Sequence, residues 1–347
     1  MTDATATEQP PQISPARRAL ARASSAAGGQ GGALIILAVL VLGFTIASSD
    51  FLTQNNVLNI LRQWSVPLIL AVGQTIVIIS RGIDLSVASI SALSGSMMGV
   101  AFAHWGWPEP AALALGLAVG FACGAFNGFV ITQWHVPDFI ATLGTFAALR
   151  GIALLVTDGL PVPDFKQSVE GRSIPDTIST LGSDTFLEIP LIAIVALVCV
   201  LIGGAILSRT RLGRAAYAIG GNTEAARSSG IKVERSKLLI YSISGLLAAV
   251  AGYMLTGRQA SANALMGEGM ELQSIAAVVI GGTNLFGGEG RMSGTVIGIL
   301  VIGVLSNGLA IVGVAEFWQR VVNGLIIIAV VALDQWRRRT AAKEGIA

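Results

Sequence analysis

The sequence predicts an all-α membrane protein: a polytopic transmembrane helical bundle of about ten spans in two pseudo-repeated halves, with both termini in the cytoplasm. Of the 347 residues, 53% are hydrophobic and only 12% are charged, whereas a soluble domain carries roughly 25% charged residues. Long apolar runs recur along the chain, and about 20 such residues span a bilayer as a helix. Basic and acidic residues gather in different connecting segments, which orients the spans.

The spans follow from the apolar runs, which are preceded by a polar arm at 1–32 that we expect to be disordered. The first run lies too far from the start, and lacks the following small-residue site, to be a cleavable signal peptide. Glycine or proline inside several runs, as at Pro67, Gly73 and Gly144, predicts interrupted helices. The runs lie at about 33–47, 57–80, 86–103, 111–132, 138–157, 189–208, 238–256, 271–286, 294–314 and 318–336.

Charge in the connections predicts the orientation. The arm, the segment 209–237 and the tail 337–347 are basic and are expected in the cytoplasm, whereas 158–188 carries six acids against two bases and should face outward. An even number of spans must then separate each pair of cytoplasmic segments. Between the segment 209–237 and the tail, the other three runs, at 238–256, 294–314 and 318–336, give an odd number. The short run 271–286 must therefore cross as well, as a half-helix paired with irregular backbone.

Two stretches resemble each other internally. Residues 77–86 (VIISRGIDLS) and 277–286 (AVVIGGTNLF) each end an apolar run, carry a glycine turn, and place a polar side chain, Asp84 or Asn284, at the matching position. Two structural halves are frequent in transporters. The alternative is that glycine-rich span ends are similar by chance.

The sequence lacks the motifs that several classes of enzyme require. The sequence has no GxxxxGK[ST] phosphate loop and no Gly-Lys dipeptide, so the chain is not itself a P-loop ATPase. It contains no GxSxG elbow and no HExxH helix. Its two histidines, His104 and His135, fall on opposite sides of the predicted membrane, and its two cysteines lie in apolar runs. We therefore expect no catalytic residue, no metal site and no cofactor bound by this chain.

Asp84 is a carboxylate at the end of a hydrocarbon run. Intramembrane charges are functional hypotheses by default. Asp84 is nevertheless predicted near the cytoplasmic edge, where it would pair with Arg81 or cap the helix that starts at Ser86. A proton relay is the less favoured alternative.

The basic segment 209–237 contains a capped helix. Asn222 is a good N-cap, Glu224 and Arg227 suit the two ends of the helix dipole, and Gly230 is placed for a left-handed C-cap. The helix would be roughly 10 Å long. An isolated helix this short is unstable in water, so it must pack against something.

Ala225 and Ala226 give this helix a slim face suited to a cleft on a partner. The alternative is a membrane-surface loop whose basic residues only follow the positive-inside rule. The residue pattern by itself does not separate the two.

Four long segments, at 73–95, 125–151, 211–231 and 276–298, carry a resemblance to a known family. They include RGIDLS, ATLGTFAALRG, GGNTEAARSSGI and GGTNLFGGEGRMSG. In this order and spacing they resemble the inner-membrane permease subunits of bacterial ABC importers for ribose, xylose, galactose and related monosaccharides. The resemblance covers about residues 50–336.

The resemblance implies a multi-pass protein of the bacterial inner membrane that pairs with a second copy or a sister permease. A cytoplasmic ATP-binding subunit, which holds the ATP and Mg²⁺, would dock below, and a periplasmic sugar-binding protein would deliver substrate from above. The central segment matches the cytoplasmic coupling segment of that family. The implied docking residues are Gly221, Asn222, Glu224, Ala225, Arg227 and Gly230.

The substrate path is not marked by a motif of the family. A sugar needs weak hydrogen-bonding groups along its path, so uncharged polar residues within the spans are candidates. Their alternative role is interhelical hydrogen bonding, worth about 0.6–2 kcal/mol each, and the spacings Gly116/Gly120/Gly124 and Gly294/Gly298 also predict close helix packing. The path candidates are Gln74, Thr75, Asn127, Thr142, Thr145, Gln273, Asn307 and Asn323.

The predicted function is therefore the permease subunit of an ATP-driven importer of a monosaccharide or related polyol, coupled to a separate ATPase. A self-contained secondary sugar transporter or facilitator is the alternative, although no span carries a clear buried acid for ion coupling. A membrane-embedded enzyme would lack a nucleophile and a metal cluster. The sequence does not choose the sugar.

Overall fold

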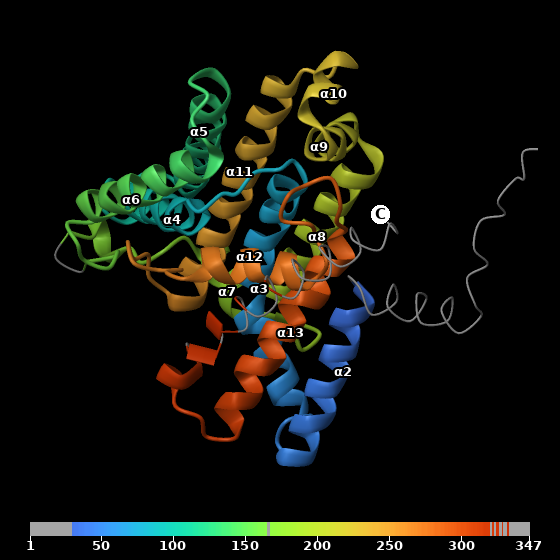
Figure 1. Cartoon of the computed structure of the whole chain (residues 1–347). Helices are drawn as coiled ribbons and strands as arrows, with labels where there is room; N and C mark the ends of the chain where they lie inside the picture. Colours follow the sequence, from blue (N-terminus) through green and yellow to red (C-terminus); the bar gives the residue numbers. More distant parts are fainter. Residues whose placement is uncertain are drawn as a thin grey trace, which may run out of the picture.

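The computed structural model describes residues 30–164, 167–319, 321–322, 324–325, 328 and 332, which form a helical bundle (Figure 1). The long helices are α2 (Gln30–Ala47), α3 (Gln54–Ile79), α4 (Val87–Ala103), α5 (Glu109–Gln133), α6 (Asp138–Val156), α8 (Leu191–Arg209), α11 (Val233–Gln259), α12 (Met270–Ile280) and α13 (Met292–Ile311). The connections contain η1 (Val169–Gly171), α7 (Asp176–Ser183), β1 (Thr185–Phe186), β2 (Ile189–Pro190), α9 (Arg211–Gly221) and α10 (Thr223–Ser228).

The described helices confirm a polytopic membrane bundle. Seven of them are long and apolar enough to cross a membrane, and α4 and α12 are shorter apolar helices. These nine helices match nine of the ten predicted runs. The arm at 1–29, most of the run 318–336 and the tail 337–347 lie outside the described residues, so the count of about ten spans stays a prediction.

Two predictions about the helices need correction, one on where the first helix begins and one on interruptions within helices. Helix α2 begins at Gln30, three residues inside the stretch 1–32 that was predicted to be a disordered arm. Helices α3 and α6 run without a break through Pro67, Gly73 and Gly144, where interruptions were predicted. The predicted half-helix at 271–286 is present as α12, which has 11 residues and is followed by irregular backbone.

Helix α3 lies at the centre of the bundle and packs against α8, α11, α12 and α13 (Figure 1). In its most apolar window 78% of the residues are buried, against 17% in α6. Helices α9 and α10 lie at the top of the bundle in Figure 1, and the turn between α2 and α3 lies at the bottom. We call these the α10 end and the opposite end.

Glycines allow the helices to approach closely. A Cβ added at Gly124 would lie 2.2 Å from the carbonyl oxygen of Tyr241 on α11, and one at Gly298 would lie 1.9 Å from that of Ala277 on α12. Both distances are far below van der Waals contact. The close packing predicted from the glycine spacings is therefore confirmed, between α5 and α11 and between α12 and α13.

The segment 209–237 is more helical than predicted. Helix α9 precedes the predicted short helix, and Thr210 caps it by accepting a hydrogen bond from the Gly213 amide (3.1 Å). Its buried face contains Ala216 and Ile219. The sequence did not indicate α9 because its glycines disfavour a helix in isolation, whereas burial of this apolar face stabilises it in the bundle.

The segment 158–188 also carries more structure than the loop that was predicted. Helix α7 packs against α11, and a Cβ added at Gly257 would lie 2.0 Å from the carbonyl oxygen of Ile178. Strands β1 and β2 form one small antiparallel pair, which is a minor addition to an otherwise helical fold.

Candidate functional site

The short helix predicted from the caps is α10, at Thr223–Ser228. Asn222 Oδ1 accepts a hydrogen bond from the Ala225 amide at 2.9 Å, and Gly230 has a φ of +83°. Arg227 Nη2 forms an ion pair with Glu234 Oε1 of α11 at 2.8 Å. The local sequence therefore specifies both ends of α10, and an exposed ion pair connects it to the first turn of α11.

The two alanines of α10 point in different directions, which corrects the prediction that they share one face. Ala226 is only 4% exposed and packs with Ala215, Ile219 and Val233. Ala225 is exposed. Each of the six predicted docking residues is likewise exposed, although their contact with a partner stays a prediction: Gly221, Asn222, Glu224, Ala225, Arg227 and Gly230.

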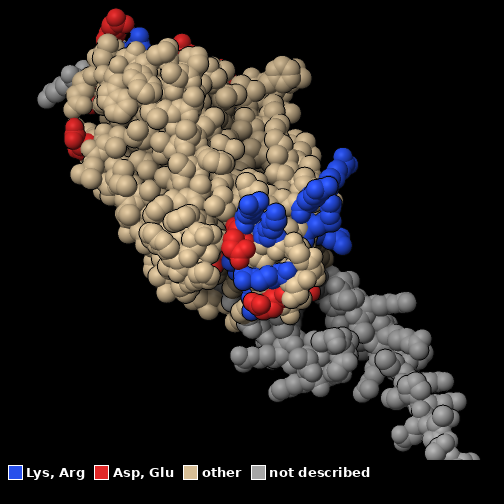
Figure 2. Space-filling view, turned by 90° about the horizontal axis from the view of Figure 1, so that it is seen from above, with Lys and Arg blue, Asp and Glu red and all other residues tan. Residues whose placement is uncertain are grey.

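Basic side chains surround α10. Seen from the α10 end, Lys and Arg gather in one patch, while most of the visible surface carries neither charge (Figure 2). Lys237 differs from the rest, since it forms an ion pair with Asp138 of α6 at 2.8 Å, and Tyr241 donates to the same carboxylate at 2.7 Å. The exposed basic residues of the segment are Arg209, Arg211, Arg214, Arg227, Lys232 and Arg235.

The junction of α9 and α10 touches two loops deeper in the bundle. A Cβ at Gly220 would lie 1.9 Å from the carbonyl oxygen of Ile79, at the end of α3, and 2.3 Å from the Gly288 amide. That amide donates to the Ile79 carbonyl at 2.9 Å, and Tyr217 Oη donates to the Gly290 carbonyl at 2.8 Å. Helix α9, which leads into α10, therefore contacts the end of α3, where the α3–α4 loop begins, and the α12–α13 loop.

These two loops contain the internal resemblance noted in the sequence. Asp84 Oδ1 accepts a hydrogen bond from the Ser86 amide at 3.0 Å, and Asn284 Oδ1 accepts one from the Phe286 amide at 3.0 Å. Both polar side chains thus close the same kind of turn after a helix end. They differ in burial, because Asp84 is 0% exposed and Asn284 is partly exposed.

Asp84 does not pair with Arg81, whose side chain is exposed. Its Oδ1 accepts from the Ser86 hydroxyl at 2.6 Å as well as from the Ser86 amide, and its Oδ2 accepts from the Ser244 hydroxyl of α11 at 3.1 Å. Gln74 donates to the Asp84 carbonyl, and Asn127 donates to the Ser86 hydroxyl at 2.7 Å. The carboxylate thus joins the α3–α4 loop to α11 within a polar network.

The described path candidates lie mainly inside the chain. Gln74, Thr75, Asn127, Thr142 and Thr145 are buried. The structure brings Gln74 and Asn127 together around the Asp84 loop, which Thr142 also contacts through the Ile83 carbonyl (3.0 Å).

The other path candidates lie elsewhere. Thr75 bonds to Thr295 at 2.6 Å, and Asn307 exchanges two hydrogen bonds with Asn56, at 2.8 and 2.9 Å. Gln273 is partly exposed, and Asn323 lies outside the described residues. Contact of any candidate with substrate stays a prediction.

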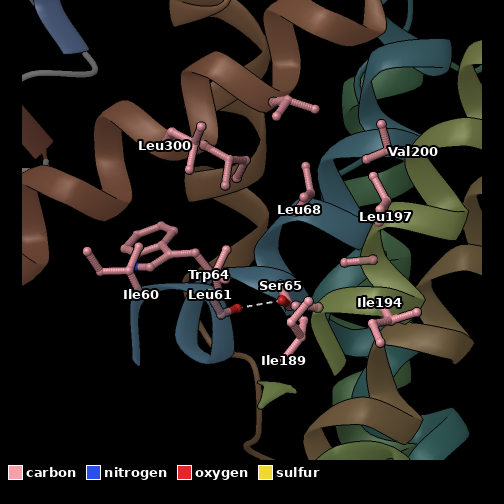
Figure 3. Close-up of a pocket in the computed structure, with 14 residues that line it drawn as sticks. Ile60, Leu61, Trp64, Ser65, Leu68, Ile189, Ile194, Leu197, Val200 and Leu300 are labelled. Atoms are coloured by element: carbon pink, nitrogen blue, oxygen red, sulfur yellow. Dashed lines mark hydrogen bonds between the residues drawn. The ribbon is translucent and has the colours of Figure 1, made fainter. Parts of the chain in front are cut away.

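An apolar groove of about 340 Å³ lies between α3, α8 and α13 (Figure 3). Trp64, Leu68, Leu197 and Leu300 are among its lining residues. The lone polar side chain in the lining is Ser65, whose hydroxyl donates to the Leu61 carbonyl. The groove offers hydrocarbon contacts and nothing that would bind a polar solute.

Arg150 and Glu271 are charged residues within the apolar helices that the sequence analysis did not single out. Arg150 lies in the span α6, and Glu271 lies in the first turn of α12 and is 7% exposed. Arg150 interrupts one predicted apolar run and Glu271 begins another, which is the signal that could have identified them. The described residues contain no group of three or more His, Cys, Asp or Glu side chains arranged for a metal ion.

Comparison with known proteins identifies the family. Residues 56–331 match the family described as "Branched-chain amino acid transport system / permease component". The chain belongs to this permease family. It is therefore a multi-pass membrane permease component of a transport system, as the resemblance predicted.

The permease is similar along nearly its whole length to sugar permeases. It is 43% identical to the ribose import permease protein RbsC of Bacillus subtilis (strain 168), over 88% of this chain and 92% of that protein. It is 41% identical to the D-allose transport system permease protein AlsC (88% and 91%) and 33% identical to the xylose transport system permease protein XylH (88% and 91%), both of Escherichia coli (strain K12). No solved structure matches the chain.

Proposed function

We propose that this permease forms the membrane path for a monosaccharide, a pentose, hexose or related polyol, in an ATP-driven ABC importer. The similarity to import permeases for ribose, allose and xylose supports a sugar over the amino acid in the family's description. The single observation that carries the coupling is α10, an exposed, capped helix that directly follows α9, whose Gly220 contacts the end of α3 and the α12–α13 loop.

The proposed partners are those that the similarity to permeases of import systems implies, and the charge pattern supports the side of the membrane given to each. A cytoplasmic ATPase subunit, which holds ATP and Mg²⁺, docks on α10, and a periplasmic sugar-binding protein docks at the opposite end, near α7. The protein lies in the bacterial inner membrane with both termini in the cytoplasm, as about ten spans in two halves. A second permease, identical or a sister chain, completes the path.

The proposed mechanism uses the contacts at Gly220. Closure of the ATPase subunits upon binding ATP moves α10, and the Gly220 junction transmits this movement to the end of α3 and to the loop that precedes α13. Because α3 is the central helix, its displacement rocks the bundle between outward-open and inward-open states. Hydrolysis then resets the ATPase. The permease supplies the path and the lever.

The test replaces Ala225 with Trp. Because Ala225 is exposed, the indole should not disturb the bundle, but it should block a docked ATPase. We expect Ala225→Trp to abolish co-purification of the ATPase subunit and ATP-driven uptake, and Ala225→Ser to retain both. Wild-type docking and uptake by the Trp variant would refute the docking assignment. Sugar uptake by the permease alone, without ATPase, would instead indicate a secondary transporter or facilitator.

A further inference from the structure

Arg150 is a charged side chain within the candidate span α6. Its Nη1 donates hydrogen bonds to the carbonyl oxygens of Ala264 (2.6 Å) and Met266 (3.1 Å), and its guanidinium lies 5.8 Å from the centroid of the Phe146 ring. Ala264 and Met266 are 2% and 5% exposed. The guanidinium is therefore fixed against a buried segment between α11 and α12.

One nitrogen of this guanidinium is buried without a hydrogen-bond partner. Arg150 Nη2 is buried and has no hydrogen-bond partner within the protein, and the same holds for Oε2 of Glu271. Arg150 interacts electrostatically with Glu271 and with Glu268. Among the described residues, however, no ion pair within 4.0 Å joins Arg150 to either acid.

Two opposite charges thus lie near each other without closing into a salt bridge. A buried charged atom without a partner is costly, so such atoms in a folded protein need an explanation. A purely structural role, in which Arg150 fixes the segment 264–266, would explain the two hydrogen bonds of Nη1. It does not explain a second nitrogen and a carboxylate oxygen that both remain without a partner.

The site lies nearer to the opposite end of the bundle than to α10. Helix α6 begins at Asp138, beside Lys237 near the start of α11, whereas Arg150 bonds to the segment that follows the end of α11. A solute that enters from the end opposite α10 would therefore meet these two groups before the Asp84 network.

We infer that Arg150 and Glu271 form a hydroxyl-binding station on the sugar path. One sugar hydroxyl accepts a hydrogen bond from Arg150 Nη2, and a neighbouring hydroxyl donates one to Glu271 Oε2. A neutral polyhydroxylated solute fits this pair because each hydroxyl both donates and accepts. The inference rests on the proposed function and names residues of the path.

The station suits transit. Two contacts orient a sugar, but hydrogen bonds to a neutral hydroxyl are weaker than an ion pair, so the solute leaves again. Glu268 is exposed and also interacts electrostatically with Arg150, so Glu268→Gln controls for the loss of a negative charge near the guanidinium without removing Glu271 Oε2.

The experiment uses the full permease complex in proteoliposomes, with its ATPase, its binding protein and radiolabelled D-ribose as the probe. We expect Glu271→Gln to lower the ribose taken up per ATP hydrolysed about tenfold, the equivalent of one hydrogen bond to a charged group. ATPase stimulation by the loaded binding protein should stay within about twofold. Glu268→Gln should leave both quantities within about twofold of the wild type.

A sugar that lacks a hydroxyl sharpens the test. The ratio of D-ribose to 2-deoxy-D-ribose uptake should fall in Glu271→Gln, which a purely structural defect would not produce. Should Glu271→Gln fail to assemble, Arg150→Lys, which keeps the positive charge, is expected to lower the same uptake ratio.

Unchanged ribose uptake per ATP in both variants would overturn the inference. Failure of the proposed function gives a different result: the wild-type complex itself would take up none of D-ribose, D-allose and D-xylose, or would take up L-leucine in their place.

Discussion

Asp84 and Glu271 are two buried carboxylates in one helical bundle, and they differ in the hydrogen bonds that the protein donates to them. The Asp84 carboxylate accepts three hydrogen bonds, from the amide and hydroxyl of Ser86 and the hydroxyl of Ser244. Oε2 of Glu271 accepts none from the protein. The first is a component of the scaffold, whereas the second is placed for a bond that another molecule supplies.

The difference shows that burial of a charge does not by itself indicate a functional site. Buried polar groups are nearly always hydrogen-bonded, so the informative observation is the atom that remains without a partner. Asp84 is the more deeply buried of the two, at 0% against 7% exposed, and is still the structural one. Three variants test this contrast, in order of their expected effect on stability.

Asp84→Ala should have the largest effect. It leaves the Ser86 amide and hydroxyl and the Ser244 hydroxyl without their acceptor, and we expect it to lower the free energy of unfolding by about 3–5 kcal/mol. The folded chain should fall below detection when detergent extracts are resolved by size-exclusion chromatography. Glu268→Ala, at an exposed acid, should elute like the wild type. If Asp84→Ala also elutes like the wild type, Asp84 does not stabilise the helical bundle.

Ser244→Ala should have an intermediate effect. It removes one of the three donors to Asp84 and leaves the Ser86 contacts intact. We expect a loss of about 1.5–3 kcal/mol, the contribution of one hydrogen bond to a charged group, measured as a lower unfolding temperature of the purified protein. Ser208→Ala, at an exposed serine of α8, is the control. If both serine variants unfold at the same temperature, the Ser244 bond contributes nothing.

Glu271→Gln should have the smallest effect on stability. It removes a charge whose Oε2 has no partner in the protein, so the free energy of unfolding should change by less than about 1 kcal/mol, or rise. The unfolding temperature should match the wild type while sugar uptake falls. If the unfolding temperature of Glu271→Gln falls as far as that of Ser244→Ala, Glu271 also stabilises the bundle and does not differ from Asp84 in role.

Much of the fold could be predicted from local sequence. The seven described helices that are long enough to cross a membrane follow from the length of the apolar runs. The ends of α10 follow from Asn222 and Gly230, because a cap involves residues within one turn. The half-helix α12 followed from counting crossings. Helix α9 was missed because its glycines argue against a helix, and its stability comes from packing in the bundle.

The candidate site could be predicted only in part. The docking residues around Ala225 are a local pattern, but the sequence could not show that Ala226 turns inward against α9. Arg150 was overlooked because a single arginine changes little in a run of apolar residues. Polar residues such as Thr75 and Asn307 were named as path candidates from composition, and the structure shows their interhelical partners, Thr295 and Asn56.

The sequence by itself determined that this chain is a helical membrane protein, where most of its spans lie, and that it carries a capped helix in a basic segment. These properties depend on residues within a few turns of one another. Only the tertiary structure decided which buried polar groups are satisfied. The Ser244 donor lies 160 positions from Asp84, and whether a distant side chain completes or omits such a bond depends on how the helices pack.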